Sequence, residues 1–465
     1  MEELPENVSA VSRLSIFLKR PMITILLVGI IIRAVLIPLL TYNYDIAFWA
    51  TTIQHAQSNN GLYNLEGYFY TPVWGYMLSF LGLIGNFVFG ISSYGTMADG
   101  LLASLGADWE FYGVMTVSPE FSILVKSFLS VFDVICAYLI YTIVKRFGYS
   151  DRKATMAFGL WFLCPIVIYT SAVHGTFDNI SVSFLLLSFL LAMDRKYMLA
   201  GASFSIAALT KFFPAYLAFM LLAYVLRTNN ERNSKAKAIL SVAAGVLITA
   251  FLILIPQIMT GYASEAFGFV FDRVSSIQND ADSLWDFIAT NGMLIVLLLQ
   301  PLAFALLGVM AYKAYKAEES KFNETFMLMF LLSATAIFLW TPAPTYLLLT
   351  IPFLIFVVVT AESESQKRYI IPLILLFVST TLYSLIMHSF SILFQSSVYM
   401  ELVSAETILN GIEWMSHIIS AGLTRQTALN LVMGALETLA IYSVFLVYII
   451  NHITSKKRRS DCVGQ

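Results

Sequence analysis

The sequence predicts an all-α integral membrane protein with about twelve transmembrane segments and a long first external loop that contains amphipathic, membrane-lying helices. Hydrophobic residues make up 58% of the 465 residues and charged residues only 12%, against roughly 25% charged in soluble domains. Apolar runs near the length of a membrane span recur along the whole chain. All but five of the 27 Lys and Arg residues fall into clusters between these runs.

The runs that we expect to enter the membrane share a low charge content and a length that approaches about 20 residues. In order, they are residues 21–40, 73–91, 120–144, 154–171, 180–193, 197–226, 238–256, 293–312, 322–340, 346–360, 369–387 and 429–453. The polar, mixed-charge residues 1–19 indicate that the first run is a retained anchor and not a cleaved signal peptide.

Basic residues orient these segments, because cytoplasmic loops collect Lys and Arg. If every cluster is cytoplasmic, residues 73–91 cannot cross, and they lie in the outer leaflet within an external loop formed by residues 41–119. The other main external loops are residues 257–292 and 388–427, and both termini are cytoplasmic.

Residues 197–226 must then enter the membrane and return on the same side. Two arms of about 22 Å each fall short of the roughly 30 Å hydrocarbon core. We therefore expect a hairpin whose turn, at Thr210 to Pro214, sits at a recessed point that faces the external side. Pro214 suits the start of the returning arm.

Several functional classes find no support in the sequence. The three cysteines have neither metal nor redox spacing and imply no disulfide framework. No second His or Cys lies near His174 at ligand spacing, so neither a metal site nor a cofactor is expected. The absence of a glycine motif of the P-loop or dinucleotide type argues against a nucleotide-fuelled pump. No basic face for nucleic acid exists outside the cytoplasmic loops.

Five basic residues lie outside the cytoplasmic clusters, namely Arg33, Lys126, Lys211, Arg273 and Arg425. A charge inside a span costs at least about 2.5–3.5 kcal/mol on insertion scales, so such residues are rarely idle. The first three sit near the outer ends of their segments, and with Arg273 they would form a cationic pocket for a phosphate. The alternative is snorkelling or structural ion pairing, and Lys126 shares a helix face with Asp133.

Two acids, Asp45 and Asp178, emerge on the external side. Asp45 follows the first span and belongs to an external loop rich in aromatic residues, among them Tyr70 and Trp74. Asp178 lies in a short polar turn with His174, where it either binds a sugar or caps the next helix. The external aromatic residues form an interfacial belt, and their faces also suit stacking on sugars.

This pattern resembles the GT-C superfamily of membrane glycosyltransferases, nearest to the lipid-linked-oligosaccharide glucosyltransferases and to prokaryotic mannosyltransferase-like relatives. Two positions depart from that superfamily: Asn43 stands where some relatives carry the first acid of a metal-associated Asp-x-Asp, and Thr71 replaces the first proline of a Tyr-Pro-Pro element. The matching elements lie within roughly residues 20–300 and are Tyr44-Asp45, Tyr70-Thr71-Pro72, Cys164-Pro165, the turn from His174 to Asn179, Lys211 at a hairpin apex, and Arg273 followed by Trp285.

The resemblance and the charge pattern lead to the hypothesis of an inverting glycosyltransferase on the extracytoplasmic face. It would move a mannose- or glucose-class hexose from a polyprenyl-phosphate donor to a hydroxyl of a glycan, lipid or protein acceptor. Asp45 would be the general base, acting without a metal. Lys211, Arg273, Lys126 and Arg33 would hold the donor phosphate, and the sugar or acceptor would be bound by Tyr70, Trp74, His174, Asp178, Asn179 and Trp285.

The same hypothesis divides the chain into a catalytic module, residues 1–300, and a C-terminal transmembrane module, residues 301–465. It places a monomer in a prokaryotic plasma membrane in preference to the endoplasmic reticulum. The alternative function is a transporter or flippase of a lipid-linked or anionic substrate, because transporters also use buried cations and broken helices. The lack of an internal repeat and the large acidic and aromatic external loop count against it. A membrane scaffold that only recruits partners is a third alternative.

Overall fold

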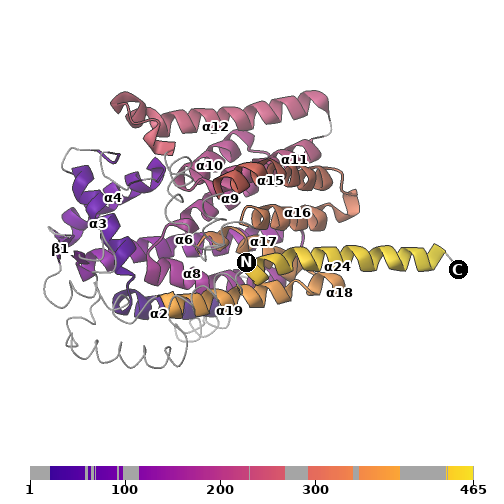
Figure 1. Cartoon of the computed structure of the whole chain (residues 1–465), viewed down its shortest axis with the longest axis horizontal. Coiled ribbons are helices and arrows are strands. Elements are labelled where there is room, and N and C mark those ends of the chain that lie inside the picture. Colours follow the sequence, from indigo (N-terminus) through magenta and orange to yellow (C-terminus); the bar gives the residue numbers. More distant parts are fainter. Residues whose placement is uncertain are drawn as a thin grey trace, which may run out of the picture.

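The computed structural model describes residues 21–57, 61–63, 68, 70–91, 94–97, 115–229, 231–267, 292–338, 345–387, 436 and 438–463. Most of its helices run side by side along the long axis of the molecule (Figure 1). The elements up to residue 267 are α2 (Pro21–Leu39), α3 (Asn43–Gln57), α4 (Pro72–Phe89), β1 (Gly95–Met97), β2 (Met115–Val117), α6 (Pro119–Arg146), α7 (Asp151–Phe162), α8 (Pro165–Tyr169), the π-helix η1 (Thr170–His174), α9 (Asp178–Met193), α10 (Tyr197–Thr210), η2 (Phe213–Leu217), α11 (Ala218–Thr228), α12 (Arg232–Thr260) and η3 (Glu265–Phe267).

The remaining elements come from the C-terminal part of the chain. They are α15 (Gly292–Tyr315), η4 (Glu319–Lys321), α16 (Phe322–Ala336), η5 (Tyr346–Leu349), α17 (Ile351–Thr360), α18 (Glu364–Lys367), α19 (Ile370–Met387) and α24 (Thr438–Val463). One buried hydrophobic cluster extends from α6 to α24, so the two halves of the chain share a core.

Polar caps and prolines start the helices where the sequence places them. The Ser118 side chain accepts a hydrogen bond from the backbone N–H of Phe121, and Pro119 opens α6. The helix ends on Lys145 and Arg146, whose positive charge suits its negative C-terminal dipole. The sequence therefore specifies the helix ends locally, before tertiary packing.

Four of the described helices are each long and apolar enough to cross a membrane, namely α2, α4, α6 and α12. A fifth span is formed if α7 and the segment Pro165–His174 are one helix, bent by 46° at the break before Pro165. All five lie within or overlap predicted membrane segments, and the chain is a multi-pass membrane protein. The count of about twelve crossings stays a prediction, and the predicted loops 257–292 and 388–427 lie largely outside the described residues.

A short antiparallel sheet is added to the predominantly helical structure of the described residues. Strand β1 pairs with β2 so that Gly95 is opposite Val117 and Met97 opposite Met115. The pairing satisfies backbone donors and acceptors that no helix covers. It also holds the chain just before α6, and Figure 1 shows α3, α4 and β1 gathered at one end of the bundle.

The hairpin predicted from residues 197–226 is present. Helix α10 ends at Thr210, Lys211 is extended, and η2 begins the return with Pro214 in its first turn. On its outer side α10 lies against α12 at two glycines. A Cβ atom on Gly201 would lie 2.0 Å from the carbonyl oxygen of Val242, and one on Gly245 would lie 2.0 Å from that of Met198. Only glycine permits this backbone approach, which fixes the position of the hairpin.

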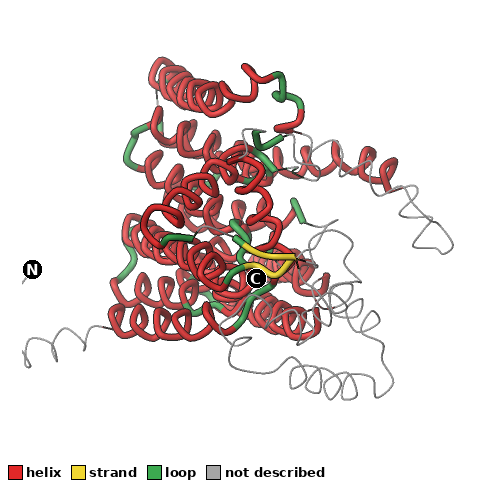
Figure 2. The backbone as a smooth tube through the Cα atoms, turned by 90° about the vertical axis from the view of Figure 1, so that its left-hand side faces the viewer, coloured by secondary structure: helices red, strands yellow, loops and turns green. Residues whose placement is uncertain are grey.

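The basic connections lie at the opposite end of the bundle from α3 and α4. Figure 1 shows the α11–α12 and α15–α16 connections and α18 at that end. Viewed from the α3 end in Figure 2, the bundle is seen along most of its helices. This arrangement fits the predicted charge topology, and which face is cytoplasmic stays a prediction.

Candidate active site

A left-handed glycine turn joins η1 to α9 and seats α3 beside it. Gly175 has φ 78°, and a Cβ atom there would lie 2.3 Å from the Cδ1 atom of Ile46. Trp49 of α3 donates from Nε1 to the Gly175 carbonyl oxygen at 2.9 Å, and the Tyr42 amide donates to the Val173 carbonyl oxygen at 3.0 Å. The segment 173–178 is therefore held against the start of the first external loop.

The first ion pair at this turn joins Asp45 of α3 to His174 of η1. His174 Nε2 lies 2.5 Å from Asp45 Oδ2, and the side chains are 13% and 16% exposed, respectively. An imidazole N–H that donates to one carboxylate oxygen fixes the orientation of the other. The structure thus brings together the predicted base and a histidine that we had assigned to sugar or acceptor binding.

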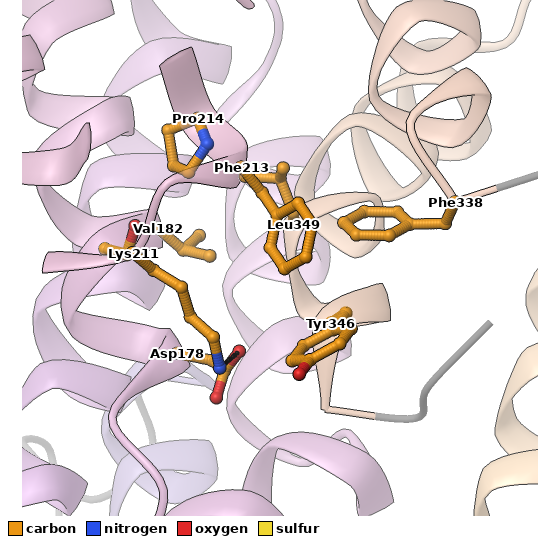
Figure 3. A pocket seen from close by; sticks show the side chains of 9 residues that line it. Asp178, Val182, Lys211, Phe213, Pro214, Phe338, Tyr346 and Leu349 are labelled. Atoms are coloured by element: carbon orange, nitrogen blue, oxygen red, sulfur yellow. Dashed lines mark hydrogen bonds and ion pairs between the residues drawn. The ribbon is translucent and has the colours of Figure 1, made fainter. Parts of the chain in front are cut away.

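The second ion pair joins Asp178, the first residue of α9, to Lys211 at the hairpin apex. Lys211 Nζ lies 2.5 Å from Asp178 Oδ1, and both side chains are nearly buried. The Lys211 ammonium also lies 4.6 Å from the ring centre of Tyr346 (Figure 3). It lies 5.2 Å from the ring centre of Phe177. Asp178 is the first helical residue of α9 and not its N-cap, which is Phe177, so the helix-cap alternative is wrong.

Two open pockets meet at Lys211. Both are small and open to solvent, so each would take only part of a large ligand. The smaller pocket is lined by Asp178, Ser181, Val182, Lys211, Phe213, Pro214, Phe338, Tyr346 and Leu349 (Figure 3). The larger is lined by Tyr70, Thr71, Thr210, Lys211, Phe212, Ala266 and Phe267.

Among the described aromatic residues of the predicted first external loop, Tyr70 lines the larger pocket. Its carbonyl oxygen accepts a 2.9 Å hydrogen bond from the Tyr63 hydroxyl. Burial raises the pKa of Tyr63, so this hydroxyl keeps its proton and remains a donor. The Tyr70 ring packs edge-on against Phe177 with ring centres 5.3 Å apart, which connects the first loop to the Lys211 side of the turn.

Trp74 occupies the aromatic core and not a pocket wall. It is fully buried and stacks on Phe177 with ring centres 4.8 Å apart, and Trp49 packs edge-on against it at 5.5 Å. An indole buried on all sides has no face for a sugar, so the prediction that Trp74 binds sugar is corrected to a packing role.

Arg33 belongs to a separate buried ion pair. Its Nε donates to Asp133 Oδ2 at 2.9 Å, and Nη1 donates to the carbonyl oxygen of Phe162 at 3.0 Å. Asn179 Nδ2 donates to Asp133 Oδ1 at 2.9 Å, and the Ser171 hydroxyl donates to Oδ2. Removing one partner of such a pair is costly, because it leaves a buried charge uncompensated. Arg33 is therefore structural, which corrects the phosphate role predicted for it. The sugar contact predicted for Asn179 stays a prediction, since its Oδ1 has no hydrogen-bond partner among the described residues.

Lys126 closes the C-terminal end of α2. Its fully buried ammonium donates to the carbonyl oxygens of Ile37 and Leu40, at 2.5 and 2.8 Å, and to the Thr41 hydroxyl at 2.7 Å. These acceptors are groups that a helix end leaves unsatisfied, and the positive charge suits the helix dipole. The predicted phosphate contact is corrected, because all three N–H donors are used. The proposed Lys126–Asp133 pair is also wrong, because Asp133 pairs with Arg33.

Replacing Lys126 tests this correction. Lys126→Met leaves buried acceptors unsatisfied at about 1–3 kcal/mol for each group, so the detergent-solubilised protein should unfold at a lower temperature. The KM for the sugar donor should change little in the protein that remains folded. Lys196→Met, at an exposed position between α9 and α10, is the matched control for loss of a lysine charge. A donor KM raised more than about tenfold at unchanged thermal stability would return Lys126 to the phosphate site.

Two predicted site residues, Arg273 and Trp285, lie outside the described residues, as does Arg425. No group of three or more His, Cys, Asp or Glu residues that could hold a metal ion occurs in the described part of the chain. Sequence reasoning missed the contribution of Phe338 and Tyr346 to the pocket beside Lys211. Both lie at the edges of apolar segments, and neither carries a charge or belongs to a motif that would have marked it.

Comparison with known families supports an enzyme. Residues 105–259 match the family model described as dolichyl-phosphate-mannose-protein mannosyltransferase. No curated protein matches the chain. The matched region contains His174, Asp178 and Lys211, whereas Asp45 precedes it. The chain is a glycosyltransferase, and the match supports the GT-C membrane type, of mannosyltransferase kind, with a polyprenyl-phosphate sugar as the general kind of donor.

Proposed function

We propose that the protein transfers a hexose, mannose in the first instance, from a polyprenyl-phosphate donor to an acceptor hydroxyl on the extracytoplasmic face. One observation carries the proposal: a single turn, residues 174–178, bears both the Asp45–His174 pair and the Asp178–Lys211 pair. A base and a cation on two sides of one turn suit a reaction in which a proton is taken at one point and a phosphate leaves at another.

In the proposed step, the acceptor oxygen attacks the anomeric carbon while Asp45 takes the proton of that hydroxyl. The new bond joins the acceptor oxygen to the anomeric carbon, and the bond from that carbon to the phosphate oxygen breaks. The electron pair of the broken bond stays on the lipid phosphate, whose growing charge is stabilised by the Lys211 ammonium. Attack opposite the leaving phosphate inverts the anomeric centre. His174 holds Oδ2 of Asp45, which leaves Oδ1 to receive the proton.

The lipid tail of the donor is proposed to run along α4. This helix carries a row of exposed apolar side chains, among which Phe87 is 86% exposed and Phe80 is 56% exposed. Tyr76 on the same helix donates to the carbonyl oxygen of Ile253 and to Gln257 in α12, at 2.9 and 2.8 Å, so α4 is tied to the outer helix of the hairpin region. An apolar face of this kind suits contact with acyl and isoprenoid chains.

Purified protein incubated with a panel of radiolabelled polyprenyl-phosphate sugars, mannose and glucose among them, tests the proposal. We expect label to pass into a new glycosidic product, with the lipid phosphate released in equal amount. In proteoliposomes, movement of label across the membrane without a new glycosidic bond would contradict the proposal and support the transporter alternative. No transfer from any donor of the panel to lipid, glycan or peptide acceptors would also contradict it.

A further inference from the structure

Lys211 already holds an anion in the place where the proposed function needs it to hold a phosphate. Its ammonium makes one hydrogen bond among the described residues, to Asp178 Oδ1 at 2.5 Å. The rings of Phe177 and Tyr346 cover parts of the same ammonium. Lys211 lines both open pockets, so a ligand oxygen can approach the ammonium beside the pair.

Asp178 and an incoming phosphate would compete for this cation. A phosphate oxygen bonded to the ammonium would lie within a few ångströms of the Asp178 carboxylate, where two like charges disfavour each other. The competition is strong here because the Asp178 side chain is only 5% exposed and that of Lys211 only 10%, so water screens the charges poorly.

We propose that Asp178 is an internal counter-ion, an inference that rests on the proposed function. Its carboxylate pairs with the Lys211 ammonium in the empty site and repels the lipid phosphate in the loaded one. In the empty protein it neutralises a buried ammonium that would otherwise be uncompensated. After transfer it lowers the affinity for the lipid-phosphate product and so favours its release. Asp178 thereby sets the balance between holding the donor and releasing the product.

A competing assignment gives Asp178 to the sugar. Its second oxygen, Oδ2, is buried and has no hydrogen-bond partner among the described residues, so it is a possible acceptor for a sugar hydroxyl. The two assignments predict opposite results for a ligand that has the phosphate and the lipid but lacks the sugar. The counter-ion predicts that removal of the Asp178 charge strengthens binding of this ligand, and the sugar contact predicts no change.

Asp178→Asn, tested with polyprenyl phosphate that carries no sugar, separates them. The amide still accepts a hydrogen bond from Lys211 but carries no charge. We expect the inhibition constant of polyprenyl phosphate to fall about tenfold, which corresponds to about 1.4 kcal/mol. The ligand should also raise the unfolding temperature of Asp178→Asn more than that of the wild type, because the phosphate replaces the missing counter-charge. Asp178→Glu, which keeps the charge, should behave as the wild type.

Asp194→Asn is the matched control, because Asp194 pairs with Arg146 at a different place in the protein, where Asp194 Oδ1 lies 2.6 Å from Arg146 Nη1. It should leave the inhibition constant unchanged. An unchanged inhibition constant in Asp178→Asn, with a raised donor KM, would overturn the counter-ion and assign Asp178 to the sugar. In that case the wild type would still transfer the sugar, and the proposed function would be unaffected. Lack of transfer by the wild type would instead contradict the proposed function, and the inference with it.

Discussion

Asp45→Asn is expected to lower kcat by about 10²–10⁴-fold while the donor KM changes little. Asparagine keeps the shape of the side chain and can still accept the hydrogen bond from His174 at the Oδ2 position. It cannot accept a proton from the acceptor hydroxyl. Lys211 pairs with Asp178, at the other end of the 174–178 turn from His174. Donor affinity should therefore stay near that of the wild type while the transfer rate falls.

Steady-state transfer with a saturating donor, together with donor binding measured by thermal shift, checks this expectation. Glu265→Gln is the control, since Glu265 is an exposed acid in η3 whose described contact is with its neighbour Ser264. It should keep full activity. Turnover by Asp45→Asn within a factor of a few of the wild type would remove Asp45 as the base. A parallel rise in donor KM would indicate a role in binding the donor.

Membrane segments and the hairpin could be predicted because they depend on local patterns. Apolar runs in the sequence predicted α6 and α12. The basic clusters predicted that the chain reverses direction within residues 197–226, and the structure shows this reversal as α10 and α11 with Lys211 between them. The two-stranded sheet could not be predicted in this way. Its strands are three residues each, and they pair across an intervening stretch of the first loop, so no local period marks them.

Roles of buried charges could not be read from the sequence, because they depend on which helices meet. Spacing along one helix suggested that Lys126 pairs with Asp133. Because α2 packs on α6, Asp133 pairs with Arg33 instead, and Lys126 donates hydrogen bonds to the end of α2. The same reason explains Asp178. From sequence it was a cap or a sugar ligand, and the neighbour that decides its role, Lys211, is 33 residues away in the chain.

Lys211→Met should raise the donor KM by roughly 10–100-fold, the effect of losing a hydrogen bond to a charged group worth about 1.5–3 kcal/mol. Methionine keeps an unbranched stem beside the rings of Phe177 and Tyr346 but carries no charge. The Asp178 carboxylate would then be buried without its cation, so the single variant should also be less stable. Loss of stability alone could raise KM, and a second variant is needed to separate the two effects.

The double variant Lys211→Met/Asp178→Asn provides this separation. It removes both charges, so its unfolding temperature should return toward that of the wild type, because no buried charge is left unpaired. Its donor KM should stay well above that of the wild type, because the cation for the phosphate is still missing. Lys313→Met, at the basic end of the bundle where Lys313 contacts Tyr448, controls for general loss of positive charge. A double variant that regains both stability and wild-type donor KM would show that the Lys211–Asp178 pair only supports the fold.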